Sequence, residues 1–247
     1  MARLAAAGCV AAEEEASAFL AAAPDAAILE SWLRRRERGE PPAWITGAVR
    51  FCGRRLRLVP GVYVPRPQSE ELARRAAALL PDEGLAVDLC TGSGAVAAHL
   101  AASVLTATVI GVDIDPRAAA CARRNGVVAV VADLADLAAP FGPTAGFDLV
   151  TAVAPYVPTD AIALLPADVQ AHEPRVALDG GSDGLDLVRR VIEAAGDLLR
   201  PGGWVLVEVG GDQDVRLPPV MSAAGFDRLV AWADEDGDPR GMAAQKA

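Results

Sequence analysis

The feature that most constrains the fold is the run at residues 87–95, which reads VDLCTGSGA. An apolar stretch leads directly into a loop with two glycines, and a helix-forming stretch follows. Glycines let a ligand approach the backbone closely, and the first turn of a helix offers free N–H groups. Asp113 ends the next apolar run, about 20 residues on, where a carboxylate can bind ribose hydroxyls. The loop and the acid together predict a nucleotide-type ligand site in an α/β domain.

From Ser69 onward, apolar runs that suit strands alternate with stretches that suit helices. Such β-α-β repeats predict a parallel sheet that is covered on both faces. The predicted helices are 69–80, 117–124 and 183–199, and the predicted strands are 85–89, 108–112, 127–131, 148–153, 204–209, 226–233 and 242–245.

The first part of the chain has a different pattern. Residues 2–38 are typical of helices, with Asp25 as a candidate N-cap. Residues 51–64 predict a β-hairpin that turns at Pro60 and Gly61. We therefore expect a helical region at 1–46, a hairpin linker at 47–67 and a Rossmann-like domain at 68–247.

Charge and cysteine content exclude several classes of protein. Lys+Arg number 23 against 33 Asp+Glu, so the net charge of −10 argues against nonspecific nucleic-acid binding. The four cysteines have no CxxC spacing, which disfavours a zinc site or a disulfide framework and predicts a cytoplasmic protein without a metal. Residues 89–112 carry no charge, but their glycines and hydroxyls favour a loop, a helix and a strand over a membrane span.

Residues 92–97 also fit the pattern G-x-G-x-x-A, so an NAD site has to be weighed. Asp88, however, precedes the glycines from within the predicted strand. An acid there suits a positively charged amino-acid ligand better than a pyrophosphate. Asp133 and Leu134 follow the third predicted strand and are candidate contacts for an adenine ring.

The loop resembles that of class I S-adenosylmethionine methyltransferases, and in particular the protein-glutamine N5-methyltransferases that modify release factors (the HemK/PrmC family). Residues 39–47, 64–70 and 173–185 resemble further segments of that family in the same order. The resemblance implies S-adenosylmethionine as cofactor. It also implies a Rossmann-like α/β fold whose mostly parallel sheet has seven strands, the last of them antiparallel. The expected cofactor-binding residues are Asp88, Cys90, Thr91, Gly92, Ser93, Gly94, Asp113, Ile114, Asp133, Leu134 and Val153.

Two departures from the family concern the methyl acceptor. The family signature after the fourth strand is Asn-Pro-Pro-Tyr, in which the Asn oxygen and a neighbouring carbonyl accept the hydrogens of the target amide. Here the residues are Val153, Ala154, Pro155 and Tyr156. The Val153 side chain accepts no hydrogen bond, and one unpaired buried amide N–H costs about 1–3 kcal/mol. The N-terminal helical segment also looks shorter than the one that the family uses to recognise release factors.

These departures favour a small apolar or aromatic acceptor, such as an indole- or peptide-derived natural product of specialised metabolism, methylated at carbon or nitrogen. A release-factor glutamine and a non-catalytic, cofactor-binding scaffold are the alternatives. If the acceptor must lose a proton, the candidate bases are Tyr156, His172 and Glu173. Arg66 can pair with the cofactor carboxylate or with an internal acid. The candidate acceptor-binding residues are Val153, Ala154, Pro155, Tyr156, Arg66, Tyr63 and Trp44.

Overall fold

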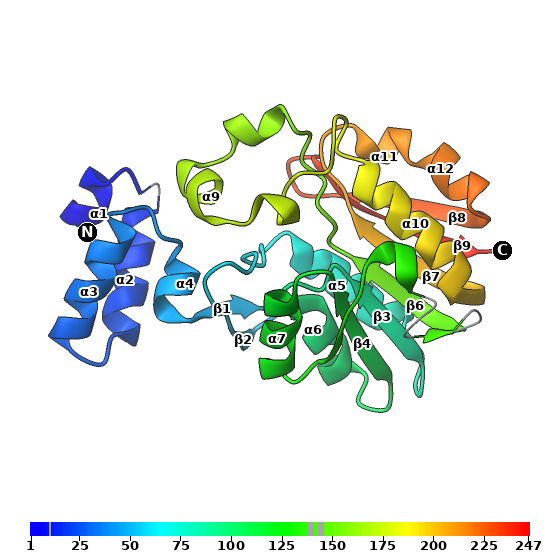
Figure 1. Ribbon diagram of the computed structural model, residues 1–247, viewed down its shortest axis with the longest axis horizontal. Helices are drawn as coiled ribbons and strands as arrows, with labels where there is room; N and C mark the ends of the chain where they lie inside the picture. Colours follow the sequence, from blue (N-terminus) through cyan, green and yellow to red (C-terminus); the bar gives the residue numbers. More distant parts are fainter. Residues whose placement is uncertain (10, 138–140, 143–145) are drawn as a thin grey trace.

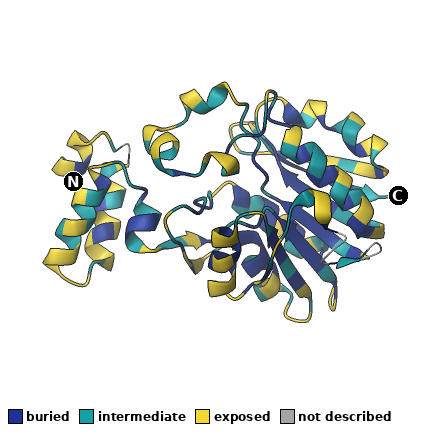
Figure 2. Cartoon of the chain, in the orientation of Figure 1, coloured by how far each residue is buried: buried dark blue, intermediate teal, exposed yellow. Residues whose placement is uncertain are grey.

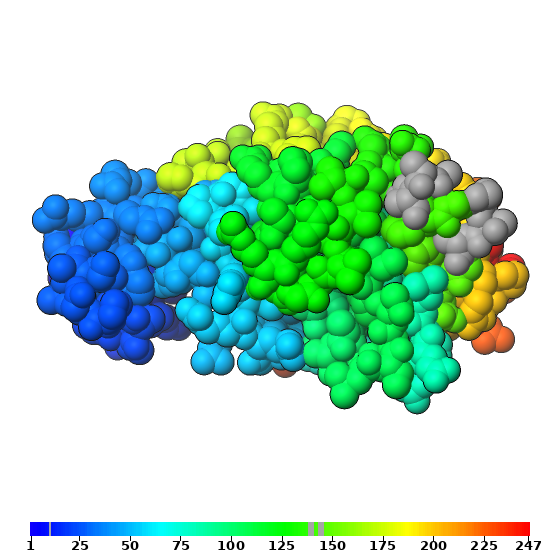
Figure 3. Space-filling model, turned by 60° about the horizontal axis from the view of Figure 1, so that its bottom comes forward, coloured from blue at the N-terminus to red at the C-terminus, as the bar shows by residue number. Residues whose placement is uncertain are grey.

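The computed structural model describes residues 1–9, 11–137, 141–142 and 146–247. Small helices at the N-terminus lie at one end, and an α/β domain makes up most of the molecule (Figures 1 and 3). Its sheet has seven strands in the order β5-β4-β3-β6-β7-β9-β8, and β9 alone is antiparallel to its neighbours, so the fold prediction is confirmed. The strands are β3 (Leu85–Leu89), β4 (Thr108–Asp113), β5 (Val128–Val131), β6 (Phe147–Ala152), β7 (Leu199–Glu208), β8 (Phe226–Ala233) and β9 (Pro239–Lys246).

Helices cover both faces of this sheet. One face contacts α5 (Ser69–Leu79), α6 (Ala95–Ser103) and α7 (Pro116–Arg124), and the other contacts α10 (Asp186–Leu198) and α12 (Pro218–Ala223). The central strands are therefore buried on both sides, as Figure 2 shows in dark blue, which explains their continuous apolar runs.

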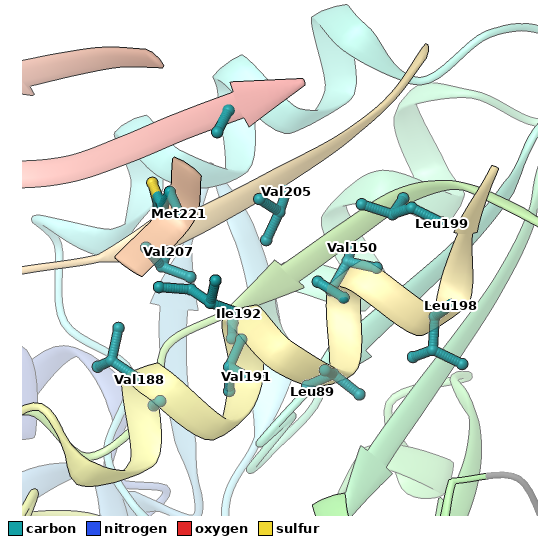
Figure 4. Close-up of a cluster of buried hydrophobic side chains, with 14 of the residues drawn as sticks. Leu89, Val150, Val188, Val191, Ile192, Leu198, Leu199, Val205, Val207 and Met221 are labelled. Carbon is teal, nitrogen blue, oxygen red and sulfur yellow. The ribbon is translucent and has the colours of Figure 1, made fainter. Parts of the chain in front are cut away.

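Helix α10 shows how the pattern creates the packing. Its Val188, Val191 and Ile192 recur at helical spacing and are fully buried. They pack beside Val150 of β6 and Val207 of β7 (Figure 4). Burial of each such side chain stabilises the fold by about 1.5–3 kcal/mol. The helix begins three residues later than predicted, because the Asp183 carboxylate accepts a hydrogen bond from the Leu185 N–H at 3.0 Å and so precedes the first turn.

The N-terminal region contains α1 (Ala2–Ala6), α2 (Ala12–Ala22), α3 (Ala26–Arg36) and α4 (Pro42–Thr46). Asp25 caps α3, as predicted, by accepting a hydrogen bond from the Ile28 N–H at 2.8 Å. Arg36 is buried and pairs with Glu15 at 2.7 Å and with Asp168 at 3.3 Å. Asp168 belongs to α9 (Ala167–His172), so this arginine ties the N-terminal helices to the segment that follows β6.

The hairpin exists, but its predicted turn is wrong. Strands β1 (Ala48–Phe51) and β2 (Arg54–Arg57) are joined by Cys52 and Gly53, whose φ angles are 47° and 72°. Positive φ at both central residues is what a tight two-residue hairpin turn requires. Pro60 and Gly61 instead form a separate turn, closed by the Val62 N–H donating to the Val59 carbonyl at 3.3 Å.

The remaining elements are short. Among the described residues no helix is both long and apolar enough to cross a membrane, and the uncharged run at 89–112 divides among β3, a loop, α6 and β4. The short elements are η1 (Leu134–Asp136), η2 (Ala161–Leu164), η3 (Arg175–Ala177) and α11 (Gln213–Arg216).

Candidate active site

A cavity of about 280 Å³ lies at the carboxyl ends of the parallel strands. Strand β3 pairs with β4 on one side and β6 on the other, and ligands of open α/β sheets bind outside such a switch point. The cavity is lined by the loops that follow β3, β4, β5 and β6, together with residues of the segments 61–69 and 174–179.

The glycine loop follows β3 and has an unusual backbone. Cys90, Gly92 and Gly94 have φ angles of 54°, 57° and 79°. Apart from Gly92 and its two chain neighbours, no heavy atom of the described residues lies within 4 Å of the position that a Gly92 Cβ would take. A Gly94 Cβ would lie 2.9 Å from the Ala122 Cβ of α7. One glycine therefore keeps the backbone open to the cavity, and the other lets α6 pack closely against α7.

Asp113 at the end of β4 fixes this loop. Its carboxylate accepts hydrogen bonds from the Gly92 N–H at 2.8 Å and the Asp115 N–H at 2.9 Å. Burial raises its pKa, although the backbone hydrogen bonds oppose the shift. Each carboxylate oxygen can accept more than one hydrogen bond, so Asp113 can also hold a ligand hydroxyl. Ile114 beside it lines the cavity and is 55% exposed, which leaves an apolar surface uncovered.

Asp88 is buried beneath the loop and lines the cavity. It accepts hydrogen bonds from the Thr91 Oγ1 at 2.6 Å and the Thr151 Oγ1 at 2.8 Å. Burial raises the pKa of Asp88 to about 6, although these two hydroxyls oppose the shift. Ser93 also lines the cavity, and its buried Oγ has no hydrogen-bond partner among the described residues. Cys90 lines it as well, and burial raises the pKa of its thiol.

Asp133 and Leu134 lie at the far side of the cavity, after β5. Asp133 caps η1 by accepting a hydrogen bond from the Ala135 N–H at 2.9 Å, and it pairs with Arg190 of α10. Arg190 lines the cavity too and was missed from the sequence. Its position in the middle of a helix gave no local signal for this contact.

The part of the cavity lining that follows β6 and the hairpin is largely apolar. Val153 and Pro155 follow β6, and Tyr63 and Pro65 come from the segment after the hairpin. Phe51 of β1 completes this wall and was not predicted. Ala154 and Trp44 are not among the described lining residues; Ala154 is buried, and Trp44 donates its indole N–H to the Val62 carbonyl at 2.9 Å, which supports the Tyr63 segment.

Arg66 pairs with the buried acid Glu173 and is not among the described residues that line the cavity, so its pairing with a cofactor carboxylate stays a prediction. The Arg66 guanidinium also stacks over the Tyr63 ring, 5.1 Å from its centroid. Glu173 accepts a further hydrogen bond from the Val64 N–H at 3.3 Å. Burial raises the pKa of Glu173, and Arg66 opposes that shift. The pair joins the segment after the hairpin to the segment after α9.

None of the three candidate bases, Tyr156, His172 and Glu173, is among the described residues that line the cavity. The Tyr156 hydroxyl donates to the Glu208 carboxylate at 3.0 Å, and burial raises the pKa of this tyrosine. His172 is not among the described residues that line the cavity. Its ring lies edge-on to Trp44, with the Nε2 atom 3.3 Å from the Arg38 carbonyl. Helix α9 ends at His172, and the extended backbone of Glu173 directs that acid inward and leaves the histidine outside.

Two buried polar residues were also missed, and of these only Ser69 is among the described residues that line the cavity. Ser69 opens α5 and lines the cavity, and Glu208 ends β7 beside Tyr156. An acid at the carboxyl end of a parallel strand is the same signal that identified Asp113, so Glu208 was open to prediction. Among the described residues, no group of three or more His, Cys, Asp or Glu side chains is arranged to hold a metal ion.

These features fit S-adenosylmethionine. The open backbone at Gly92 and the unpartnered Ser93 hydroxyl suit its amino-acid part, and Asp113 suits its ribose. The fold and the site define a class I S-adenosylmethionine-dependent methyltransferase.

Comparison with known proteins identifies the family. A family model described as "Methyltransferase domain" matches residues 86–170. A release factor glutamine methyltransferase from Geobacter sulfurreducens is 36% identical over 84% of this chain and 74% of its own length. A 4-amino-L-phenylalanine/4-methylamino-L-phenylalanine methyltransferase from Streptomyces pristinaespiralis is 38% identical over 78% of this chain and 69% of its own length. The chain belongs to the HemK/PrmC-like family of methyltransferases.

A solved structure supports the fold alone. The ribosomal protein L11 methylase from Lactobacillus delbrueckii subsp. bulgaricus aligns with a TM-score of 0.55 at 18% identity, over 78% of this chain and 86% of that one. The family model and the curated relatives show that the protein is an S-adenosylmethionine-dependent methyltransferase, so the hypothesis of a non-catalytic scaffold is not retained.

Proposed function

We propose that this enzyme methylates a small apolar or aromatic acceptor rather than a protein glutamine. S-adenosylmethionine, held by the glycine loop and Asp113, would supply an electrophilic methyl group, and the acceptor carbon or nitrogen would supply the electron pair of the new bond. The protein's own contribution is then to bind the acceptor, exclude water and hold the attacking atom in line.

The observation that carries this proposal is the wall around Val153. Val153 and Pro155 face the cavity together with Phe51, Tyr63 and Pro65. A primary amide bound there would lose its water and gain no side-chain acceptor from position 153. Leaving one amide N–H unpaired costs about 1–3 kcal/mol, which corresponds to roughly a 10–100-fold loss of rate or affinity. A flat aromatic ring carries no such penalty.

Two kinds of relative bear on the choice between a small aromatic acceptor and a protein glutamine. Several relatives are named release factor glutamine methyltransferases, and a backbone carbonyl at 153 or 154 could hold one amide hydrogen. Protein glutamine is therefore the second candidate. The Streptomyces relative, named for a substituted phenylalanine, supports a small aromatic acceptor at similar sequence identity.

The proposal is tested by offering both acceptors separately with labelled S-adenosylmethionine. One is a release factor that carries its Gly-Gly-Gln loop, and the other is 4-amino-L-phenylalanine, with tryptophan as an indole alternative. We expect methylation of a small aromatic compound and no efficient methylation of the release factor. Efficient methylation of the glutamine would overturn the proposal.

A further inference from the structure

Ser69 is a polar residue in the apolar wall of the cavity. Ala152 of β6 is in register with Val207 of β7, so Val153 and Glu208 follow as neighbours at the carboxyl edge of the sheet. Helix α5 packs on β7 and begins with Ser69. Ser69 and Val153 both line the cavity, and the acid Glu208, which is not among the described lining residues, is buried at the end of the strand against which α5 packs.

Both polar groups are buried and incompletely paired. Ser69 is 3% exposed and Glu208 is 2% exposed. Glu208 Oε1 receives the Tyr156 hydroxyl at 3.0 Å. Within the part of the chain that the structure describes, Glu208 Oε2 and Ser69 Oγ have no hydrogen-bond partner. Buried polar atoms of this kind are uncommon in folded proteins and point to a ligand or a function.

The surroundings indicate how the pair is oriented. Burial raises the pKa of Glu208, and the nearby hydroxyls of Ser69 and Tyr156 oppose that shift. If the Ser69 hydroxyl donates its proton to Glu208 Oε2, its oxygen keeps its lone pairs for a ligand in the cavity that Ser69 lines. In this arrangement the site offers a hydrogen-bond acceptor, not a donor, to whatever binds against Val153.

We propose that Ser69 Oγ accepts a hydrogen bond from an N–H of the methyl acceptor and that Glu208 is the positioning residue that orients Ser69. This inference rests on the proposed function and narrows it: the acceptor is a small aromatic amine or another apolar molecule methylated at an N–H nitrogen, not at carbon. The hydrogen bond would hold the nitrogen so that its lone pair points along the cavity toward the glycine loop. Val153 would press against the ring and contribute no competing polar group.

The test compares wild type, Ser69→Ala, Ser69→Thr and Glu208→Gln. The control is Ser222→Ala, which removes an exposed hydroxyl on α12. Binding of 4-amino-L-phenylalanine and of L-phenylalanine is measured by calorimetry in the presence of S-adenosylhomocysteine. Methyl transfer to the amine, the affinity for S-adenosylhomocysteine and the melting temperature are measured in parallel.

In wild type we expect the amine to bind about 10-fold more tightly than L-phenylalanine, the value of one good hydrogen bond. Ser69→Ala should abolish this preference and raise KM, whereas Ser69→Thr should restore both. Glu208→Gln should lower kcat about 10-fold or more with a smaller change in KM. Affinity for S-adenosylhomocysteine should be unchanged in every variant, and Ser222→Ala should match wild type.

The outcomes separate the two proposals. If wild type methylates aromatic amines but Ser69→Ala does so equally well, or only its melting temperature falls, the role of Ser69 is structural and the inference is overturned. The inference on Ser69 is also overturned if the enzyme methylates only the carbon of an indole. The same holds if it binds 4-amino-L-phenylalanine and L-phenylalanine equally or binds neither. In these cases the proposed function still stands. An enzyme that methylates only the release factor overturns both.

Discussion

The two sides of the cavity are built by different means. On the side that we propose for the cofactor, the essential geometry belongs to the backbone: positive φ angles at Cys90, Gly92 and Gly94, and N–H groups held by Asp113. On the side that we propose for the acceptor, side chains from segments far apart in the sequence form the wall. A binding site formed by backbone atoms changes only when the fold changes, whereas a surface formed by side chains changes with a single substitution. Such an enzyme can therefore keep its cofactor while its acceptor differs.

The largest expected effect is on the cofactor side. Asp113→Ala removes the carboxylate that faces the cavity and frees the N–H groups of Gly92 and Asp115. Two hydrogen bonds from ribose hydroxyls of the ligand to the charged Asp113 carboxylate would be worth several kcal/mol. Affinity for S-adenosylhomocysteine should therefore fall by about 100-fold or more. Calorimetry measures this, and circular dichroism checks that the variant is folded. An affinity within about 3-fold of wild type would show that Asp113 does not bind the cofactor.

On the acceptor side, Val153→Asn should restore the amide oxygen that the family uses. We expect methylation of a release-factor glutamine to appear or to rise by about 10–100-fold, with affinity for S-adenosylhomocysteine unchanged. Val153→Leu is the matched control, because it alters the same position without adding an acceptor. If Val153→Asn gains no glutamine activity while it binds cofactor normally, position 153 is not the residue that selects the acceptor.

A smaller effect concerns the stability of the cofactor side. Because burial raises the pKa of Asp88 to about 6, the folded state binds its proton more tightly than the unfolded state does. The resulting stability is fully present below the ordinary carboxyl pKa and is lost as the pH rises through about 6. Relative to Asp88→Asn, wild type should therefore become less stable by about 2 kcal/mol between pH 4 and pH 7, or roughly 4–8 °C in melting temperature. A difference that is independent of pH would contradict this.

The smallest effect should come from His172. Because it packs on Trp44 and is not among the described cavity-lining residues, His172→Ala should change kcat/KM for any acceptor by less than about 2-fold, well below the 10²-fold or more that a general base contributes. A fall of 100-fold, with unchanged cofactor affinity, would show that this ring reaches the acceptor after all.

The contrast between local backbone geometry and contacts of distant side chains also explains what the sequence could predict. The glycine loop and Asp113 are local patterns whose geometry follows from residue type, and the alternating helices and strands fix the parallel sheet. The hairpin turn was misplaced because Cys52 adopts a left-handed conformation that cysteine rarely takes, while Pro60 and Gly61 form a turn of their own.

Contacts between distant segments were harder to foresee. Ser69 and Glu208 meet only because α5 packs on β7, and Arg190 reaches Asp133 only because α10 crosses the sheet near η1. His172 and Glu173 are adjacent in sequence, yet only the acid turns inward to Arg66. No periodicity in a single segment distinguishes these cases, because tertiary packing decides each of them.

The central claim is that the wall around Val153 selects a small aromatic acceptor over a protein glutamine. A competition assay tests it most directly: one reaction contains labelled S-adenosylmethionine, a release factor with its Gly-Gly-Gln loop and 4-amino-L-phenylalanine, and the label in each product is counted. The account predicts that wild type places nearly all label on the small molecule and that Val153→Asn shifts label toward the glutamine. Label on the release factor alone with wild type would contradict it.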